Sequence, residues 1–78
     1  MLIDKINALL SLKSSNITKF SKFAGTTQAN ISKKGKSNTL YLREAVQLAE
    51  FTNTRLSFID NETNKELISF DKDDITVL

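Results

Sequence analysis

The spacing of apolar residues changes at Asn53, and this change divides the chain into two parts. Before Asn53, apolar residues recur every three or four positions, which predicts amphipathic helices. After it, the apolar runs RLSFID and ELISF flank NETNK, a segment of turn-forming residues. The second pattern predicts a β-hairpin over residues 55–70, with a short helix over residues 54–59 as the alternative. The tail DKDDITVL fits either a third strand or a last turn of helix.

Capping and turn residues divide the first part into four expected helices. These helices cover residues 2–13, 18–24, 28–34 and 40–52. The expected N-caps are Thr18, Thr27 and Thr39. The expected helix ends, each a residue that tolerates a left-handed backbone, are Asn16, Gly25, Gly35 and Asn53. The sequence therefore predicts one mainly α domain over residues 1–78, in which four helices precede a short C-terminal hairpin.

Positive charge is concentrated in the middle of the chain. Residues 13–43 contain seven basic residues and no acidic one, whereas residues 44–78 contain eight acidic residues and three basic ones. The formal net charge of +2 hides this division. A basic half points to an anionic partner, although a merely solvated lysine-rich surface would have the same composition.

The residue types that are missing exclude several classes of function. The chain has no cysteine and no histidine, which excludes disulfides, thiolate and imidazole catalysis, and the usual zinc and haem sites. Without paired carboxylates or a phosphate-binding glycine loop, we expect no catalytic residue, no metal and no cofactor. No apolar run approaches the roughly twenty residues that cross a membrane. We therefore expect a cytoplasmic protein without membrane contact and without enzyme activity.

The second and third expected helices satisfy the demands of two helices that meet at a tight turn. Ser21, four residues before the turn, is small enough for the other helix to cross close to it. Gly25 tolerates the positive φ of the turn, and Ile31 faces inward from the third helix. Phe20 and Ala24 supply the inner face of the second helix. This pattern predicts a helix-turn-helix whose second helix enters a major groove.

The segments ITKFSKFAGTTQANIS and TLYLREAVQLAEFTNTRLSFI resemble the Cro/repressor-type (XRE-like) helix-turn-helix family of phages and mobile elements. The resemblance covers about residues 2–59 and implies a four-helix lambda-repressor-like domain, with residues 18–34 as the helix-turn-helix and residues 40–52 as the supporting helix. It also implies a sequence-specific regulator, such as a repressor, that binds double-stranded DNA as a homodimer.

The alternative is a protein-binding helix-turn-helix, such as an antirepressor or a phage-encoded inhibitor of a nucleic-acid-binding partner. The early Gly35, which predicts a short third helix, slightly favours this alternative. So does Lys34, because the family usually has an apolar residue there. Thr27 and Gln28, at the start of the third helix, favour DNA.

The expected DNA contacts form two sets. The residues expected to read bases lie on the outer face of the third helix: Thr27, Gln28, Ala29, Ser32 and Lys33. The residues expected to contact phosphate are Thr18, Lys19, Lys22, Lys34, Lys36, Asn38 and Arg43. Lys33 of the first set is also expected to contact phosphate, because lysine is a flexible point charge. In the base-reading set, the Gln28 amide can bond N6 and N7 of adenine. Alternatively, Gln28 and two or three of the lysines are simply solvated.

The hairpin contains more apolar residues than the core of a 78-residue chain needs. Four of them fit either the core or an exposed dimer surface: Phe58, Ile59, Leu67 and Ile68. Together with Phe70, they form the expected dimer interface, within a homodimer contact made by residues 54–78.

Overall fold

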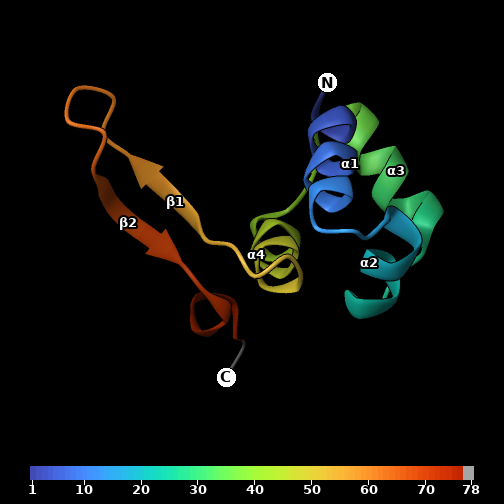
Figure 1. Cartoon of the computed structure of the whole chain (residues 1–78). Coiled ribbons are helices and arrows are strands. Elements are labelled where there is room, and N and C mark those ends of the chain that lie inside the picture. Colours follow the sequence, from blue (N-terminus) through green and yellow to red (C-terminus); the bar gives the residue numbers. More distant parts are fainter. Residues whose placement is uncertain (77–78) are drawn as a thin grey trace.

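A computed structural model describes residues 1–76, which form four α-helices, a two-stranded antiparallel hairpin and a 3-10 helix. The elements are α1 (Leu2–Leu12), α2 (Ile17–Phe23), α3 (Gln28–Ser37), α4 (Leu42–Phe51), β1 (Leu56–Ile59), β2 (Glu66–Phe70) and η1 (Lys72–Ile75). The helices gather on one side, and the hairpin extends away from them (Figure 1). The prediction of a mainly helical chain with a C-terminal hairpin is confirmed. None of the helices in residues 1–76 has the length and apolar character needed to cross a membrane.

All four helices contribute to the core. Its buried residues are Ile3, Ile6, Leu10, Ile17, Phe20, Ile31 and Leu48. Phe20 and Ile31 are fully buried, as expected, and the ring of Phe20 lies 5.7 Å from that of Phe51 in α4. The buried Ser21 hydroxyl donates to the Thr18 carbonyl at 2.8 Å, so its polar atom is satisfied inside the core.

Gly35 lies inside α3 and does not end it. The helix continues to Ser37, and Asn38 is its left-handed C-cap, with φ of 56°. A Cβ on Gly35 would lie 2.8 Å from Cδ1 and 3.0 Å from Cα of Ile3, so α1 and α3 approach closely at this point. The prediction of a short third helix is therefore wrong, because this glycine serves helix packing.

The start of α2 also differs from the prediction. Asn16 is the N-cap in place of Thr18, because its extended backbone lets its side chain accept a hydrogen bond from Lys19 N at 3.0 Å. Asn16 was expected in the left-handed region, which Ser14 occupies instead, with φ of 55°. An Asn residue can end one helix through a left-handed backbone, or begin the next because its side chain caps the helix. Here Asn16 begins α2.

The start of α4 lies two residues later than expected. Thr39 is not its N-cap, because the Thr39 hydroxyl pairs with that of Ser37 at 2.6 Å. The helix begins at Leu42, and the Glu44 side chain accepts a hydrogen bond from Tyr41 N at 2.9 Å. Half of a capping box therefore replaces the expected threonine cap.

Three of the expected local signals are confirmed. Thr27 caps α3, because its hydroxyl oxygen accepts a hydrogen bond from Asn30 N at 3.1 Å. Gly25 and Asn53 have positive φ, 72° and 55°, two residues beyond the last residues of α2 and α4. These residues set the turn between α2 and α3 and the exit from the helical part of the chain.

Asp60 organises the hairpin loop. Its backbone N–H donates to the Lys65 carbonyl at 2.8 Å, and its carboxylate accepts hydrogen bonds from Glu62 N and the Thr63 hydroxyl. Asn64 takes the left-handed conformation that closes the loop, with φ of 59°. The hairpin prediction is confirmed, and the alternative helix over residues 54–59 is wrong.

The apolar residues of the hairpin do not join the core. Phe58 is 65 % exposed, Ile59 54 %, Leu67 65 % and Ile68 61 %, whereas Phe70 at the root of the hairpin is half-buried. The core interpretation of the first four is wrong, because the two strands leave the helices instead of folding over them (Figure 1).

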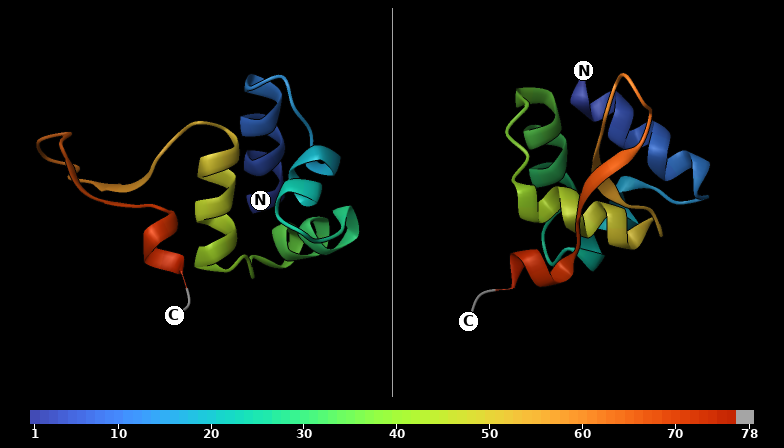
Figure 2. Two further views of the ribbon diagram at one scale, coloured as in Figure 1. Left: turned by 90° about the horizontal axis from the view of Figure 1, so that it is seen from below. Right: turned by 90° about the vertical axis from the view of Figure 1, so that its left-hand side faces the viewer.

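The acidic tail forms a turn of helix, η1, and not a third strand. Figure 2 shows η1 beside α4. The Asp71 carboxylate accepts a hydrogen bond from Asp73 N at 2.9 Å, and the Asp74 carboxylate accepts one from Asp71 N at 2.8 Å. These carboxylates therefore cap the helix. The rest of the tail, residues 77–78, lies outside the described residues.

Candidate nucleic-acid interface

The outer face of α3 carries short and basic side chains at helical spacing. We call this set the α3 stripe: Gln28, Ala29, Ser32, Lys33 and Lys36. Ser32 is half-buried, and the other four are exposed. A shallow hollow lies over Ala29, Ser32 and the residues toward Ser37. Because α3 is longer than predicted, Lys36 extends the stripe by one more turn and joins residues that the sequence placed in the base-reading set.

Thr18 of α2 holds the side chain of Gln28. Its Oγ1 donates to Gln28 Oε1 at 2.8 Å, and both residues are exposed. The amide keeps its Nε2 donors, and Oε1 retains a second lone pair. Adenine requires one donor and one acceptor of this kind in the major groove. Thr18 was expected to contact phosphate, but the bond to Gln28 uses its single hydroxyl hydrogen.

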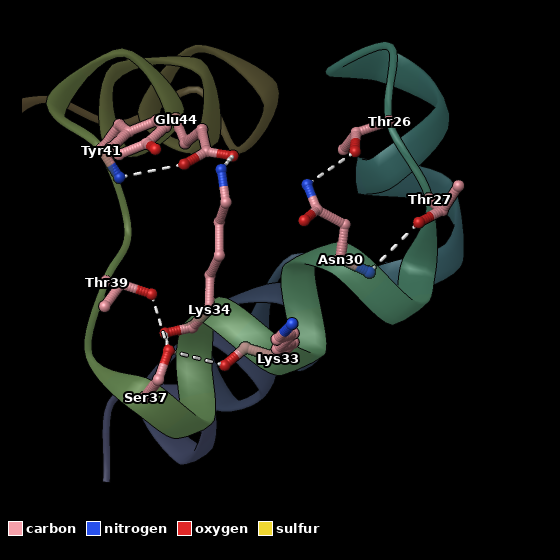
Figure 3. A network of polar contacts seen from close by, with 9 residues as sticks. All are labelled: Thr26, Thr27, Asn30, Lys33, Lys34, Ser37, Thr39, Tyr41 and Glu44. Carbon is pink, nitrogen blue, oxygen red and sulfur yellow. Dashed lines mark hydrogen bonds and ion pairs between the residues drawn. The ribbon is translucent and has the colours of Figure 1, made fainter.

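The turn before α3 is fixed by a network of side-chain hydrogen bonds (Figure 3). Asn30 Nδ2 donates to the Thr26 hydroxyl at 2.9 Å, while Thr26 N donates to the Ser21 carbonyl at 2.9 Å. Thr27 accepts the cap hydrogen bond from Asn30 N and keeps its own hydroxyl hydrogen to donate. The first turn of α3, which carries Gln28, is thus held against the end of α2.

Lys34 is not part of the exposed basic surface. Its Nζ lies 2.7 Å from Glu44 Oε2 and 4.1 Å from the centroid of the Tyr41 ring (Figure 3). The side chains of Lys34 and Glu44 are only 18 % and 7 % exposed. Lys34 therefore joins α3 to α4 instead of offering a free charge to phosphate. Its methylene stem supplies the packing that an apolar residue would provide.

The other residues of the expected phosphate set lie at the surface. Lys19, Lys22, Lys36, Asn38 and Arg43 are all exposed, on α2, on α3 and its C-cap, and on the first turn of α4. Within the described residues 1–76, none of these four cations forms an ion pair, and neither does Lys33 of the α3 stripe. Their charges remain available to an external anion.

Two partners in this region escaped sequence reasoning. Glu44 was not recognised as the partner of Lys34, although a glutamate at the third position of a helix is one half of a capping box. Tyr41 at the N-cap hid that signal, because Ser or Thr is expected there. The hydrogen bond from Thr18 to Gln28 also escaped it, since these residues are ten positions apart and belong to different helices.

The arrangement supplies the two kinds of contact that duplex DNA requires. Exposed cations can neutralise phosphates, and an oriented amide among short side chains can approach base edges. Comparison with protein-family models, with curated proteins and with solved structures finds no match. Any functional assignment thus depends on the geometry of α2, α3 and the surrounding cations.

Proposed function

We propose that this chain is a small sequence-specific DNA-binding regulator, in which α2 and α3 form a helix-turn-helix and α3 enters the major groove. The observation that carries the proposal is the orientation of Gln28 by Thr18 at the start of the α3 stripe. The stripe lies in a segment, residues 13–43, that has no carboxylate. An anionic surface can therefore approach it without local repulsion.

The dimensions of α3 suit this role. An α-helix with its side chains is about 10–12 Å across, and the major groove is about 12 Å wide, so a helix fits into it. Gln28 and Lys36 are eight residues apart, so the α3 stripe is about 12 Å long. Ala29 and Ser32 lie between these two residues and are short enough for the helix to approach the base edges. The exposed lysines supply most of the affinity through release of counterions, and the first turn of α3 supplies discrimination between sequences.

The alternative, a helix-turn-helix that inhibits a nucleic-acid-binding partner, loses the two features that favoured it. α3 is not short, because Gly35 lies within the helix. Lys34 is paired with Glu44 and so does not interrupt the packing of α3. The remaining basic face suits both functions, and only binding measurements separate them.

The test compares Gln28→Ala with Lys33→Ala on two kinds of DNA. Selection from random duplexes first identifies a preferred sequence, and titrations at several salt concentrations then measure binding to that sequence and to random DNA. We expect Gln28→Ala to weaken binding to the preferred sequence by about 1–3 kcal/mol and to leave random DNA unaffected. Lys33→Ala weakens both and lowers the salt slope by about one.

Lys65→Ala is the matched control, because it removes the same charge from the hairpin loop, away from α3 (Figure 1). It should leave the salt slope unchanged. If selection returns no preferred sequence and Gln28→Ala binds every duplex like the wild type, the groove-reading assignment is wrong. Binding to a protein partner that is lost in Gln28→Ala would then favour the inhibitor.

A further inference from the structure

The hairpin loses the alternation of apolar and polar residues toward its loop. Near the helices, two serines pair across the strands and make one face polar. Toward the loop, Phe58 and Ile59 are both apolar, and they point to opposite faces because successive residues of a strand alternate. Phe58 pairs with Ile68, and Leu67 adjoins Ile68 where the pairing of the strands shifts register. These four residues, which we call the apolar tip, therefore give both faces of the hairpin apolar side chains.

Each side chain of the apolar tip is more than half exposed. The helices cover neither face, because the strands extend away from them (Figure 1). Continuous apolar runs are typical of strands that are buried on both faces, and a two-stranded hairpin without cover is marginally stable in water. A contiguous exposed apolar patch marks an interaction surface. The apolar tip is such a surface, and it needs a partner that contacts both of its faces.

The chain exposes more surface than a compact protein of its mass. Its accessible surface is 5793 Å², whereas a folded monomer of 8.8 kDa exposes about 4,800 Å². Its radius of gyration is 13.0 Å, against about 11.5 Å for a compact domain of 78 residues. The excess of about 1,000 Å² is close to the roughly 800 Å² that each partner buries in a standard interface. The projecting hairpin is the visible source of this excess (Figure 1).

The segments that flank the apolar tip are acidic. Residues 54–78 contain six acidic residues and three basic ones. Five of these carboxylates form no ion pair within the described residues 1–76: Asp60 and Glu62 in the loop, and Asp71, Asp73 and Asp74 at the root of the hairpin. Complementary charge across an interface steers partners together, and like charge keeps them apart. The surface therefore suits a partner that offers positive charge beside an apolar region.

A second copy of the chain does not combine these properties. A two-fold contact through one face of the hairpin would leave the other face in water and would bring two acidic segments together. The basic part of a second copy has only a shallow hollow, over Ala29 and Ser32 of α3, which does not enclose a hairpin. The same carboxylates repel nucleic acid. The partner of the apolar tip is therefore a different protein.

We propose that the apolar tip inserts into an apolar groove of a different protein, whose rim carries lysine or arginine side chains. A groove encloses the hairpin from both sides, so it covers Ile59 together with Phe58. The rim cations pair with the carboxylates of the loop and root. The inserted hairpin leaves the α3 stripe free, because it projects from the other side of the helices (Figure 1). The inference thus goes beyond DNA binding and does not depend on it.

The first step of the test is photocrosslinking of the full chain in cells that produce it. The photoreactive residue p-benzoylphenylalanine replaces Phe58 in one variant and Ile59 in another, so that it probes the two faces separately. Leu12 of α1 is the matched control position, because it is an apolar residue outside the hairpin and is 82 % exposed. We expect both hairpin positions to crosslink to the same protein, and the Leu12 position not to crosslink to it.

The second step measures binding of the captured protein, after its purification, to variants of the chain. Phe58→Glu and Ile59→Glu should each weaken binding by about tenfold or more, as expected for residues at the centre of an interface. Leu12→Glu should bind like the wild type. Glu62→Gln keeps the shape of the side chain and removes its charge, so it should slow association and reduce the dependence of association on salt. Circular dichroism should show unchanged helix content, since none of these side chains belongs to the core.

Three results would overturn the proposal. The first is crosslinking from both hairpin positions to a second copy, which would support the homodimer predicted from the sequence, or to no protein at all. The second is a different product from Phe58 than from Ile59, because one groove would not then enclose both faces. The third is a captured protein that binds Ile59→Glu as tightly as the wild type, or Glu62→Gln with unchanged salt dependence. Titrations of the α3 variants with DNA test the proposed function on other residues, so the two can fail independently.

Discussion

The Lys34 ammonium in α3 lies 2.7 Å from a carboxylate oxygen of Glu44 in α4. The other oxygen of Glu44 accepts a hydrogen bond from Tyr41 N at the start of α4. One carboxylate thus satisfies a helix terminus and a cation from the neighbouring helix. Because Glu44 is almost fully buried, removal of Lys34 would leave its charge without a counter-ion.

Lys34→Ala should therefore act on stability. We expect it to lower the free energy of unfolding by about 2–3 kcal/mol, below the range for fully buried pairs because Lys34 keeps some contact with water. Lys33→Ala, its neighbour on the α3 stripe, should change stability by less than about 0.5 kcal/mol. Urea unfolding followed by circular dichroism measures both. Equal effects would show that the ion pair contributes nothing beyond an exposed lysine.

Gly35→Ala should destabilise the chain, although alanine normally favours a helix over glycine by about 1 kcal/mol. The added Cβ would overlap Ile3, including its backbone Cα, so α1 and α3 must move apart. We expect a net loss of about 1–3 kcal/mol in thermal or urea unfolding.

Ile3→Val and Gly25→Ala provide the controls for this prediction. Ile3→Val removes Cδ1, the nearest clashing atom, so Gly35→Ala should cost less in that background. Gly25→Ala meets no atom within 4 Å and costs about 1–2 kcal/mol through its positive φ. That cost should be the same in both backgrounds. A Gly35→Ala variant as stable as the wild type would contradict the close crossing of α1 and α3.

Ile31→Asp should abolish cooperative folding. Ile31 is fully buried between α3 and the other helices, and the substitution both empties its site and places a charge there. The whole stability of a small domain is of the same order as this combined cost. Ala29→Asp, on the exposed side of the same helix, should melt cooperatively. A cooperative melt of Ile31→Asp would show that the register of α3 is wrong.

Apolar spacing and turn residues were sufficient to predict the order of the helices, the inward face of α3 and the hairpin. Helix ends were less predictable, because one residue type serves two purposes. Gly25 supplies a positive φ and Gly35 supplies space for Ile3, but both look like helix ends in the sequence. Thr39 looks like the N-cap of α4 but does not cap it, and Asn16 looks like the end of α1 but is the N-cap of α2.

The candidate site was predictable only as a face of α3. Periodicity identifies which residues share a helix face, but it says nothing about how neighbouring helices are oriented. The pairing of Lys34 with Glu44 and the contact of Thr18 with Gln28 both join different helices across ten residues of sequence. The sequence therefore predicts phosphate contacts for Lys34 and Thr18, because it shows no partner for either side chain within the protein. The exposure of Phe58 likewise depends on the direction of the hairpin, which its sequence does not specify.

The hydrogen bond between Thr18 and Gln28 leads to a prediction that distinguishes two roles of Thr18, which are to orient Gln28 and to contact phosphate. Thr18→Val keeps the shape of the side chain and removes the hydroxyl, so Gln28 loses its fixed position. We expect binding to the preferred DNA sequence to weaken by about 0.5–1.5 kcal/mol, with random DNA unaffected. Thr18→Ser keeps the hydroxyl and should retain wild-type affinity.

A double-mutant cycle completes this test, because an orienting residue has no effect once the residue that it orients is gone. In a Gln28→Ala background, Thr18→Val should therefore cause no further loss on the preferred sequence. A phosphate contact would behave differently, since the loss would be the same in both backgrounds and would extend to random DNA. Equal losses in the two backgrounds would return Thr18 to the phosphate set. The hydrogen bond to Gln28 would then belong only to the DNA-free protein.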